Sequence, residues 1–345
     1  MDNMDKKVYM TILTLLLTPA FQISPKAIAT LYVDPPTTVT SVGSTFSVNI
    51  TISDVIDLAG WEFRLYYLSS NLNGTNVEEG PLLKEGGSTY FAAINFTDDY
   101  NSTHGLAWVT CALLKGSGVN GDGTLAVVTF EAKQLGISDL SLTDTLLSDS
   151  EPIPHIALNG IVYILPHDVA ITNVIPSKII VGQGLTAKID VSVLNEGNFT
   201  ETFNVTVYAN TTAIQTETLT LTSQSFTTLT FTWNTSGFAK GKYMISACAW
   251  PVPGETDTAD NNFTGGWVRV SMAGDLTGGT PSPWGFVPDG KVDGKDIAIV
   301  ALCFGSAPGC PPPYVWNPNS DVNGDGKVDG KDIATVALHF GQADP

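Results

Sequence analysis

The sequence predicts a mainly β protein, built as two β-sandwich domains followed by a small module of loops and short helices. Three observations support this fold class. Short runs of alternating apolar and polar residues fill most of the chain, the alternating pattern restarts after residue 165, and residues 272–345 contain a near-identical repeat. Alternation with a period of two is typical of half-buried strands, whereas a fixed repeat indicates a duplicated structural unit.

The length and charge of the chain limit what it can be. Its 345 residues exceed what one hydrophobic core usually serves, so we expect two or three domains. Asp and Glu number 34 against 16 Lys and Arg, which gives a net charge of −18. Neutralising phosphate groups requires clustered Lys and Arg, so we expect no nucleic-acid partner.

Residues 1–29 have the features of a secretory signal peptide. Lys6 and Lys7 precede an apolar stretch, and Ala27-Ile28-Ala29 forms a small-x-small cleavage site. The apolar stretch is shorter than the roughly 20 residues that span a bilayer, so we expect no membrane insertion. The protein is therefore expected outside the cell, secreted or at the cell surface, and frequent Asn-x-Ser/Thr glycosylation sequons agree with that location.

Residues 30–165 contain the first group of expected strands. Alternating runs cover 46–52, 59–65, 107–111 and 124–132, and turn residues separate them. No window of comparable length shows an apolar stripe with a 3.6-residue period. Many short strands with regularly spaced turns favour a β-sandwich or jelly roll.

Residues 166–271 contain the second group. Alternation is clear over 185–193, 203–209, 229–233 and 243–247, with Asn- and Gly-rich turns between the runs. A unit of this size with this pattern predicts a second sandwich, similar in size to an immunoglobulin-like domain.

The last expected unit, residues 272–345, is built on the repeat. Residues 289–305 recur as residues 325–341 with only two differences. Each copy ends in a short apolar helix, expected at 297–304 and 333–340 and stopped by a glycine. Helices this short are marginal alone, so a bound metal should contribute directly to folding.

Residues 321–332 carry the clearest chemical motif. They match the calcium-loop pattern D-x-[DN]-x-[DN]-G, with further acids at loop positions 9 and 12. Side chains at positions 1, 3 and 5 converge on one point, and Gly326 permits the sharp turn between them. We expect calcium ligands from Asp321, Asn323, Asp325, the Lys327 carbonyl, Asp329 directly or through water, and Asp332. The alternative, an Asx-rich turn without metal, leaves these acidic side chains uncompensated.

The first copy is interrupted. Asp289, the Lys291 carbonyl, Asp293 and Asp296 keep the second half of the loop, but apolar or glycine residues stand where it should begin. Asp275 and Thr277 supply the missing start if residues 278–287 are an insertion, which loop-closure entropy tolerates. We therefore expect two calcium ions, one per loop.

The duplicated loop-and-helix units resemble a dockerin domain, the calcium-dependent module by which extracellular proteins bind a cohesin. The resemblance covers residues 274–342 and implies two helices related by a pseudo-two-fold axis. It also implies that a cohesin-type domain is the partner, which the near-identical copies would bind in two orientations. Dockerins often carry hydroxyl residues at loop positions 10 and 11, where this chain has Gly294-Lys295 and Gly330-Lys331.

Residues 29–165 resemble a cohesin-type domain in the stretches 41–50, 60–67, 121–130 and 159–164. That family is a jelly roll related to carbohydrate-binding modules. Residues 167–270 resemble the CARDB family of immunoglobulin-like spacers, through 195–197 and 251–261. Together these resemblances imply a secreted surface protein of archaeal type.

Aromatic residues in the first domain suggest a second kind of ligand. They are Trp61, Tyr66, Tyr67, Tyr90 and Phe91. Such residues can stack on sugars, but alternating aromatics in strands are more often part of a core.

Catalysis is not expected. The four histidines are widely separated, and neither an H-E-x-x-H nor a G-x-S-x-G motif is present. Cys303 and Cys310 are expected to form a small disulfide in an oxidising compartment, whereas Cys111 and Cys248 are expected to be buried thiols.

The leading hypothesis is a non-catalytic adhesion or scaffolding protein that docks through its calcium-dependent module. The partner would be a cohesin-type domain of another protein, or of another copy of itself in head-to-tail association. The alternatives are an accessory protein that binds polysaccharide and a surface-layer component.

Overall fold

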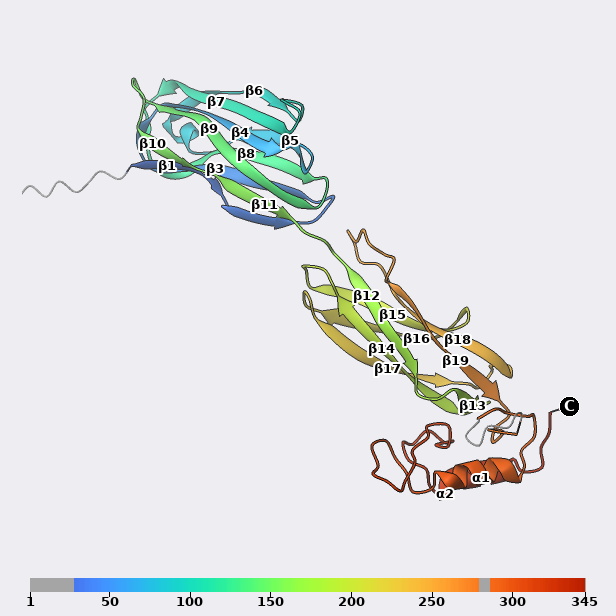
Figure 1. The fold of residues 1–345 in the computed structure, drawn as a ribbon. Coiled ribbons are helices and arrows are strands. Elements are labelled where there is room, and N and C mark those ends of the chain that lie inside the picture. The colour runs from blue at the N-terminus through green and yellow to red at the C-terminus, as the bar shows by residue number, and fades with distance from the viewer. Residues whose placement is uncertain (1–27, 279–285, 345) are drawn as a thin grey trace, which may run out of the picture.

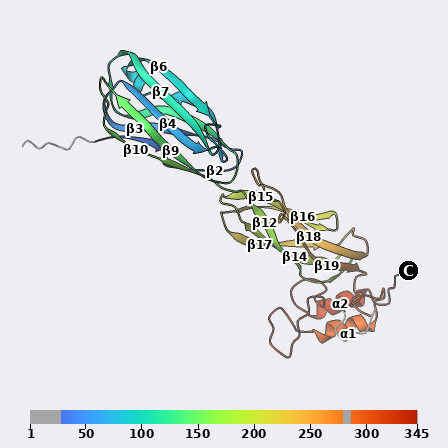
Figure 2. The ribbon, with the colours of Figure 1, turned by 45° about the horizontal axis from the view of Figure 1, so that its top comes forward.

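The computed structural model describes residues 28–278 and 286–344, arranged as two β-rich bodies and a small helical one in an elongated row (Figures 1 and 2). The prediction of a mainly β protein is confirmed. The proposed signal peptide and most of the proposed insertion lie outside the described residues. In the described part of the chain, no helix combines the length and the apolar character needed to cross a membrane.

The first domain contains eleven strands and a short 3₁₀ helix, η1 (Leu83–Gly86). Its first sheet has the order β10-β1-β3-β8-β5 and its second the order β2-β11-β9-β4-β7-β6. The strands are β1 (Ala29–Asp34), β2 (Thr37–Thr40), β3 (Thr45–Leu58), β4 (Gly60–Leu68), β5 (Leu72–Glu79), β6 (Gly87–Thr97), β7 (His104–Gly116), β8 (Val119–Ala132), β9 (Gly136–Ser148), β10 (His155–Leu158) and β11 (Gly160–Ile164).

One apolar core fills the space between these two sheets. It takes alternate residues from each strand, so Trp61, Phe63 and Leu65 point inward from β4 while Glu62 and Arg64 do not. This is the two-residue period that the sequence showed. Parallel pairs at two sheet edges, β1 with β10 and β2 with β11, show that the chain crosses between the sheets rather than forming a simple meander.

The second domain packs a three-stranded sheet, β12-β14-β17, on a five-stranded sheet, β13-β19-β18-β15-β16. Its buried core includes Trp233, Phe231 and Val207. The strands are β12 (Val169–Pro176), β13 (Ile180–Gly182), β14 (Thr186–Asn195), β15 (Glu201–Ala209), β16 (Thr212–Leu221), β17 (Phe226–Asn234), β18 (Gly241–Ala249) and β19 (Asn262–Ser271).

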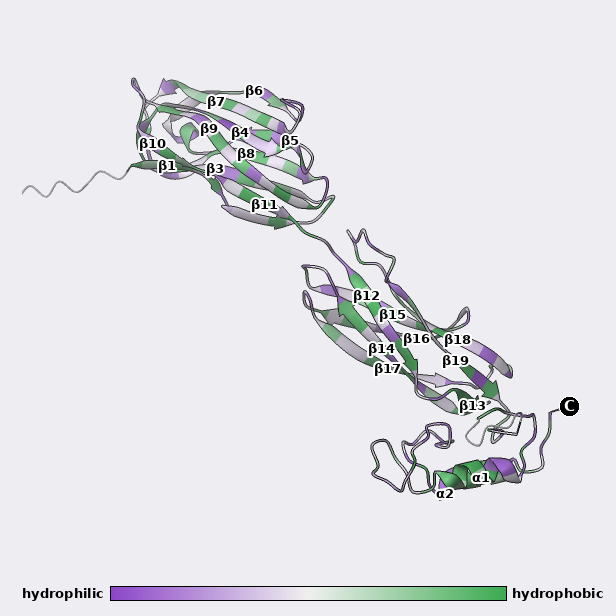
Figure 3. Cartoon of the chain, in the orientation of Figure 1, coloured by the Kyte–Doolittle hydropathy of each residue, from purple (hydrophilic) through white to green (hydrophobic). Residues whose placement is uncertain are grey.

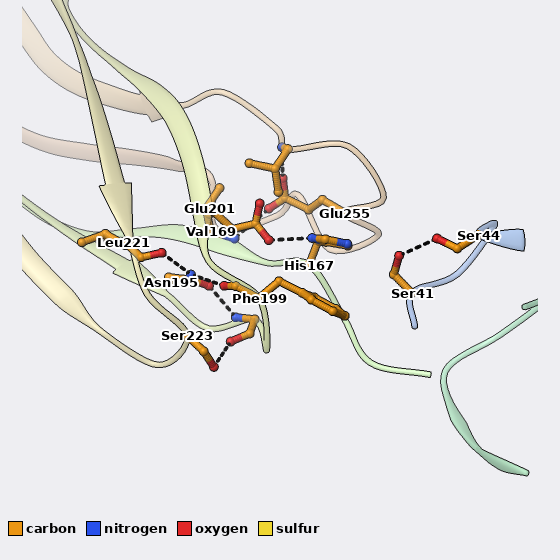
Figure 4. Close-up of polar contacts among 12 residues, drawn as sticks. Ser41, Ser44, His167, Val169, Asn195, Phe199, Glu201, Leu221, Ser223 and Glu255 are labelled. Carbon is orange, nitrogen blue, oxygen red and sulfur yellow. Dashed lines mark hydrogen bonds and ion pairs between the residues drawn. The ribbon is translucent and has the colours of Figure 1, made fainter. Parts of the chain in front are cut away.

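Side chains from the second domain surround the chain where it arrives from the first (Figure 4). The Nδ1 atom of His167 lies 2.5 Å from Oε1 of Glu201, and the His167 ring stacks on Phe199 at 4.3 Å between centroids. The Val169 N–H donates to Oε1 of Glu255 at 3.0 Å. Three residues from two separate segments of the second domain therefore fix the start of β12.

The C-terminal module contains two helices, α1 (Gly294–Leu302) and α2 (Gly330–Leu338), which pack against each other. Both are strongly apolar along most of their length (Figure 3). They start three residues earlier and end two residues earlier than the apolar pattern predicted. The earlier start follows from Asp293 and Asp329, which cap the helices and form capping boxes with the acids three residues on.

The predicted disulfide is wrong. Cys303 and Cys310 are unbonded in this structure. Cys303 follows the last residue of α1 and is buried in the core of the module, while the Cys310 thiol lies near the Tyr314 carbonyl. Cys111 is a buried thiol as predicted, and Cys248 is only partly buried.

Candidate functional site

The second loop of the C-terminal module is organised around the carboxylate of Asp321. Oδ1 of Asp321 accepts hydrogen bonds from the N–H groups of Gly324 at 2.9 Å and Asp325 at 3.0 Å, and Oδ2 accepts one from Gly326 at 2.9 Å. Gly324 and Gly326 have φ of +77° and +89°, a conformation that side chains strain. The two glycines therefore let the chain turn its amides inward around position 1 of the loop.

The end of the loop is fixed by Asp332. Its Oδ1 accepts from the Asn323 N–H at 3.1 Å and its Oδ2 from the Asp329 N–H at 2.8 Å. The second bond is half of the α2 capping box, so the same carboxylate closes the loop and starts the helix. Asp332 is 0% exposed.

The structure separates the predicted ligands of this loop into two groups. Asp321, Asn323, Asp325 and Asp332 are linked by hydrogen bonds around one centre. Asp329 instead caps α2 and pairs with Nζ of Lys327 at 2.8 Å, which lowers the pKa of Asp329. Asp329 is thus directed away from the centre that the other four share.

The first loop has the same framework despite its interruption. The Asp275 carboxylate accepts from the N–H groups of Asp289 at 3.1 Å and Gly290 at 3.0 Å. Asp289 and Gly290 occupy the repeat positions of Asp325 and Gly326. Asp275 therefore stands at position 1, where the sequence analysis placed it.

The acid at position 12 of the first loop completes the parallel. Oδ1 of Asp296 accepts from the Leu276 and Thr277 N–H groups, and Oδ2 from Asp293 at 2.9 Å. Asp293 caps α1, and the carboxylate of Asp289 accepts from the Lys291 N–H. A backbone bridge between Gly278 and Pro288 closes the base of the interrupting segment, so the loop leaves and re-enters the framework at one point.

Buried carboxylates make both loops fit a hard cation. Asp275, Asp296, Asp321 and Asp332 are each at most 5% exposed, and none of them has an ion pair among residues 28–278 and 286–344. Burial raises the pKa of Asp275 to about 6 and also raises those of Asp296 and Asp321. Ionised carboxylates in such positions need a compensating charge, and an all-oxygen donor set suits Ca²⁺.

The side chains of these loops do not by themselves form a complete metal site. Nowhere in the described ranges do three or more His, Cys, Asp or Glu side chains gather as they would around an ion. Asn323, Thr277 and backbone carbonyls fall outside that set of residue types. Ligation would therefore depend on amide, hydroxyl and backbone oxygens as well as carboxylates.

The second domain contacts both loops, and this contact could not be predicted from the sequence. Lys178, in the segment between β12 and β13, donates from Nζ to the Asp321 carbonyl at 2.5 Å. Oδ1 of Asn319 accepts from the Ile179 and Ile180 N–H groups. On the other side, Oγ of Ser271 donates to the Asp275 carbonyl at 2.8 Å. A cavity of about 180 Å³ lies between Lys178 and the second loop.

The free surface of the module is apolar at repeated positions. Leu302 and Leu338 are 61% and 80% exposed, and Phe304 and Phe340 are 52% and 58% exposed. The two pairs occupy equivalent positions in the two copies. Exposed apolar groups that recur in this way mark a surface for interaction.

The outer face of the first domain carries a second cluster. The Arg64 guanidinium lies 4.3 Å from the Trp108 ring centroid and 2.5 Å from Oδ2 of Asp144, and Trp108 donates to Glu62 at 2.8 Å. These residues belong to β4, β7 and β9 of the six-stranded sheet.

Most of the aromatic residues singled out from the sequence lie elsewhere. Trp61 and Tyr67 are core residues, and Phe91 packs against the core. Tyr66 is partly buried and Tyr90 is 59% exposed.

Comparison with known proteins finds one family model that matches part of the chain. Residues 31–162 match the family model of the cohesin domain. The matched segment covers the strands from β1 to β11 and leaves the remaining two parts of the chain outside it. No curated protein matches the chain.

Several solved structures are similar to parts of the chain. A non-cellulosomal cohesin from Archaeoglobus fulgidus is 20% identical, with 40% of this chain and 91% of that chain covered and a TM-score of 0.33. A cohesin–dockerin complex from Clostridium thermocellum is 18% identical, covering 40% and 93%, with a TM-score of 0.32. A CARDB domain from Pyrococcus furiosus, crystallised with di-metal ions, is 26% identical, covering 31% and 94%, with a TM-score of 0.27.

Proposed function

We propose that this protein is a secreted, non-catalytic scaffolding or adhesion protein that docks to a partner through its calcium-loaded C-terminal module. The observation that carries the proposal is the repeated framework of buried carboxylates, Asp275 with Asp296 and Asp321 with Asp332, each facing converging backbone amides. The match of the first domain to the cohesin family supports the class of function.

Calcium would be held at two centres. In the second loop the ligands are Asp321, Asn323, Asp325, Asp332 and the Lys327 carbonyl, with Asp329 at most through water. In the first loop they are Asp275, Thr277, Asp289, Asp296 and the Lys291 carbonyl, while Asp293 caps α1. The ion would supply positive charge that the buried carboxylates lack, and so would stabilise the starts of both helices.

The docking surface we propose is the repeated apolar pair on each helix end, Leu302 with Phe304 and Leu338 with Phe340. Each helix also carries an exposed lysine in its first turn, since the Lys295 and Lys331 side chains are 63% and 71% exposed. Because the two halves repeat, a partner would find nearly the same surface in two orientations.

The partner we propose is a cohesin-type domain, either of another protein or of a second copy of this chain. Residues 30–165 carry 15 acidic and four basic side chains, so the exposed Lys295 and Lys331 are the groups of the module whose charge is complementary to that surface. Contact between the C-terminal module of one copy and the first domain of the next is heterologous. Such contacts form open filaments unless they close into a ring.

Sedimentation of the full chain in millimolar calcium and in EDTA tests this function. We expect association in calcium, and melting at lower temperature in EDTA for the C-terminal module but not for the first domain. The double variant L302D/L338D should abolish association while keeping calcium binding. The control is F226D, at a second-domain residue that is 78% exposed. Absence of calcium binding by the unaltered chain would overturn the proposal.

If the unaltered chain binds calcium but stays monomeric, self-association is excluded and the partner is a different protein. Capture of a purified dockerin or cohesin partner would then be measured with the same two variants. Ordered two-dimensional arrays in calcium would instead favour a surface-layer component.

Polysaccharide binding is the second candidate, and one observation favours it. Trp108 and Arg64 form a flat, partly exposed surface on the outer face of the first domain, of a kind that stacks on sugar rings. Glycan-array binding that is lost in W108A would support it. The matched control is W267A, which removes an exposed tryptophan next to Lys242 in the second domain.

A further inference from the structure

Position 1 of the first loop is Asp275 and that of the second is Asp321. The backbone carbonyl of each accepts a hydrogen bond from a different kind of group in the second domain. The backbone carbonyl of Asp275 accepts a hydrogen bond from the Ser271 hydroxyl, whereas that of Asp321 accepts one from the Lys178 ammonium. The two loops share a framework of backbone amides on the carboxylate at position 1, although the first loop is interrupted and its Asp275 accepts two such hydrogen bonds where Asp321 accepts three. They also differ in that a neutral donor contacts one and a charged donor contacts the other.

Lys178 is buried, which is uncommon for a lysine. Its residue is 5% exposed, and its Nζ forms no ion pair with a carboxylate anywhere in residues 28–278 or 286–344. Burying an ammonium without a paired charge is costly. Burial lowers the pKa of Lys178, and the carboxylates of Asp321 and Asp332 act against that shift by favouring the charged ammonium.

The segment that carries Lys178 is built into the module. Ile180 belongs to the same buried core as Val292, Val300 and Val336. Oδ1 of Asn319 holds the Ile179 and Ile180 N–H groups at 2.9 and 3.1 Å. The ammonium is therefore fixed beside the second loop by packing and by backbone hydrogen bonds, so it cannot swing out freely.

We propose that Lys178 is an internal cation of the second loop, which balances its buried carboxylates in the metal-free protein and opposes the entry of a divalent ion. The inference rests on the calcium binding proposed above. Its first consequence is that the second loop stays folded without metal better than its sequence alone would allow. Its second is that the site has a lower calcium affinity than the same loop without this lysine.

A further consequence concerns the module as a unit. Because Lys178 and Ile180 come from the second domain, the loops and that domain are expected to act as one body. Calcium at the second loop would then change the stability of the junction, while calcium at the first loop, held by Ser271, would change it less.

The experiment uses the full chain and three substitutions. K178M removes the charge and keeps the apolar stem, K178R keeps the charge, and K188M removes an exposed lysine that lines the same cavity. Each protein is stripped with EDTA, melted, and then titrated with Ca²⁺ alone by calorimetry. For K178M we expect a lower metal-free melting temperature of the module and about tenfold tighter binding in one of two steps.

K178R and K188M should keep both properties of the unaltered chain. The proposal is overturned if K178M binds calcium with unchanged or weaker affinity, or if its metal-free melting equals that of K188M. If K178M does not fold, K178Q serves in its place, since glutamine keeps a donor for the Asp321 carbonyl without the charge. Absence of calcium binding in the unaltered chain would overturn the calcium proposal, while the EDTA melts would still report on Lys178 separately.

Discussion

The two loops of the C-terminal module form a natural comparison, because one copy is interrupted and the other is continuous. In the second loop, the Asp321 carboxylate accepts hydrogen bonds from amides that follow it closely in the chain, at Gly324, Asp325 and Gly326. In the first, Asp275 accepts the equivalent amides of Asp289 and Gly290 across the interruption. Recurrence of the same hydrogen bonds shows that the framework depends on which groups converge, and not on an unbroken chain between them.

The position of the interruption explains why the framework persists. The interrupting residues lie between Thr277, at loop position 3, and Asp289, at position 5. The Gly278 and Pro288 backbones pair there. The side chains on either side therefore keep their spacing. Closing a longer loop costs only a logarithmic increase in entropy.

The largest expected effects come from removing the position-1 carboxylate of each loop. D321A leaves three backbone N–H groups without their acceptor and D275A leaves two, so both should destabilise the metal-free module, D321A more. Hydrogen bonds to charged groups are worth about 1.5–3 kcal/mol each, so losses of several kcal/mol are expected before compensation by water. Each variant should also lose one of the two calcium-binding steps.

Chemical denaturation in EDTA and calorimetric titration measure the two effects. The control is N317A, a substitution in the same module but outside both loops, which removes no carboxylate. If D275A retained both calcium steps while D321A lost one, the similarity of the frameworks would not extend to metal binding.

Deleting residues 279–288 should have a smaller effect and sharpens the comparison further. The deletion joins Gly278 to Asp289 and produces an uninterrupted twelve-residue loop with acids at positions 1, 5, 9 and 12. Loop-closure entropy predicts a gain of about 0.5 kcal/mol, or about two- to threefold tighter calcium binding in the first step only. A weakened first step would show that the interrupting segment contributes ligands or packing of its own.

The comparison also shows which parts of the candidate site can be predicted from the sequence. Asp275 could be assigned to position 1 because Asp275 and Thr277 supply the missing start of the motif once the residues before the intact half are treated as an insertion. The starts of the helices were predicted too late, because apolar periodicity does not register the capping aspartates. Lys178 and Asn319 could not be found at all, since their contacts arise from the packing of two units far apart in the chain.

In the first domain, too, the sequence predicts the alternation along a strand but not which face of the strand is buried. Alternation predicted that residues of β4 point to two sides, but the sequence did not establish which side is the core. Trp61 is buried, while Trp108 on the neighbouring strand β7 lies on the outer face with Arg64. The expected disulfide failed for a related reason, because Cys303 lies at the end of a helix whose packing directs it inward.

A third group of acidic residues lies in the second domain and lacks the amide framework of the loops. Replacing one of these acids is expected to have a small effect on stability. Oδ1 of Asp168 and Oδ1 of Asp260 are buried with no hydrogen-bond partner in the described residues. Burial first, and then the Asp260 charge, raises the pKa of Asp168 to about 6. An acid whose folded pKa is raised destabilises the fold as pH rises from about 4 to 6, because the folded state must give up a proton it holds more tightly.

D168N should therefore raise the melting temperature of the second domain at pH 7 and have no effect near pH 4. We expect a gain on the order of 1 kcal/mol, because solvent screens this partly exposed group. D190N, which removes the same charge from an exposed position on β14, controls for the change in net charge. Equal gains from D168N at both pH values would mean that local packing, and not the repulsion among these carboxylates, limits stability here. In the two loops of the C-terminal module, hydrogen bonds from backbone amides oppose the same kind of repulsion among buried acids.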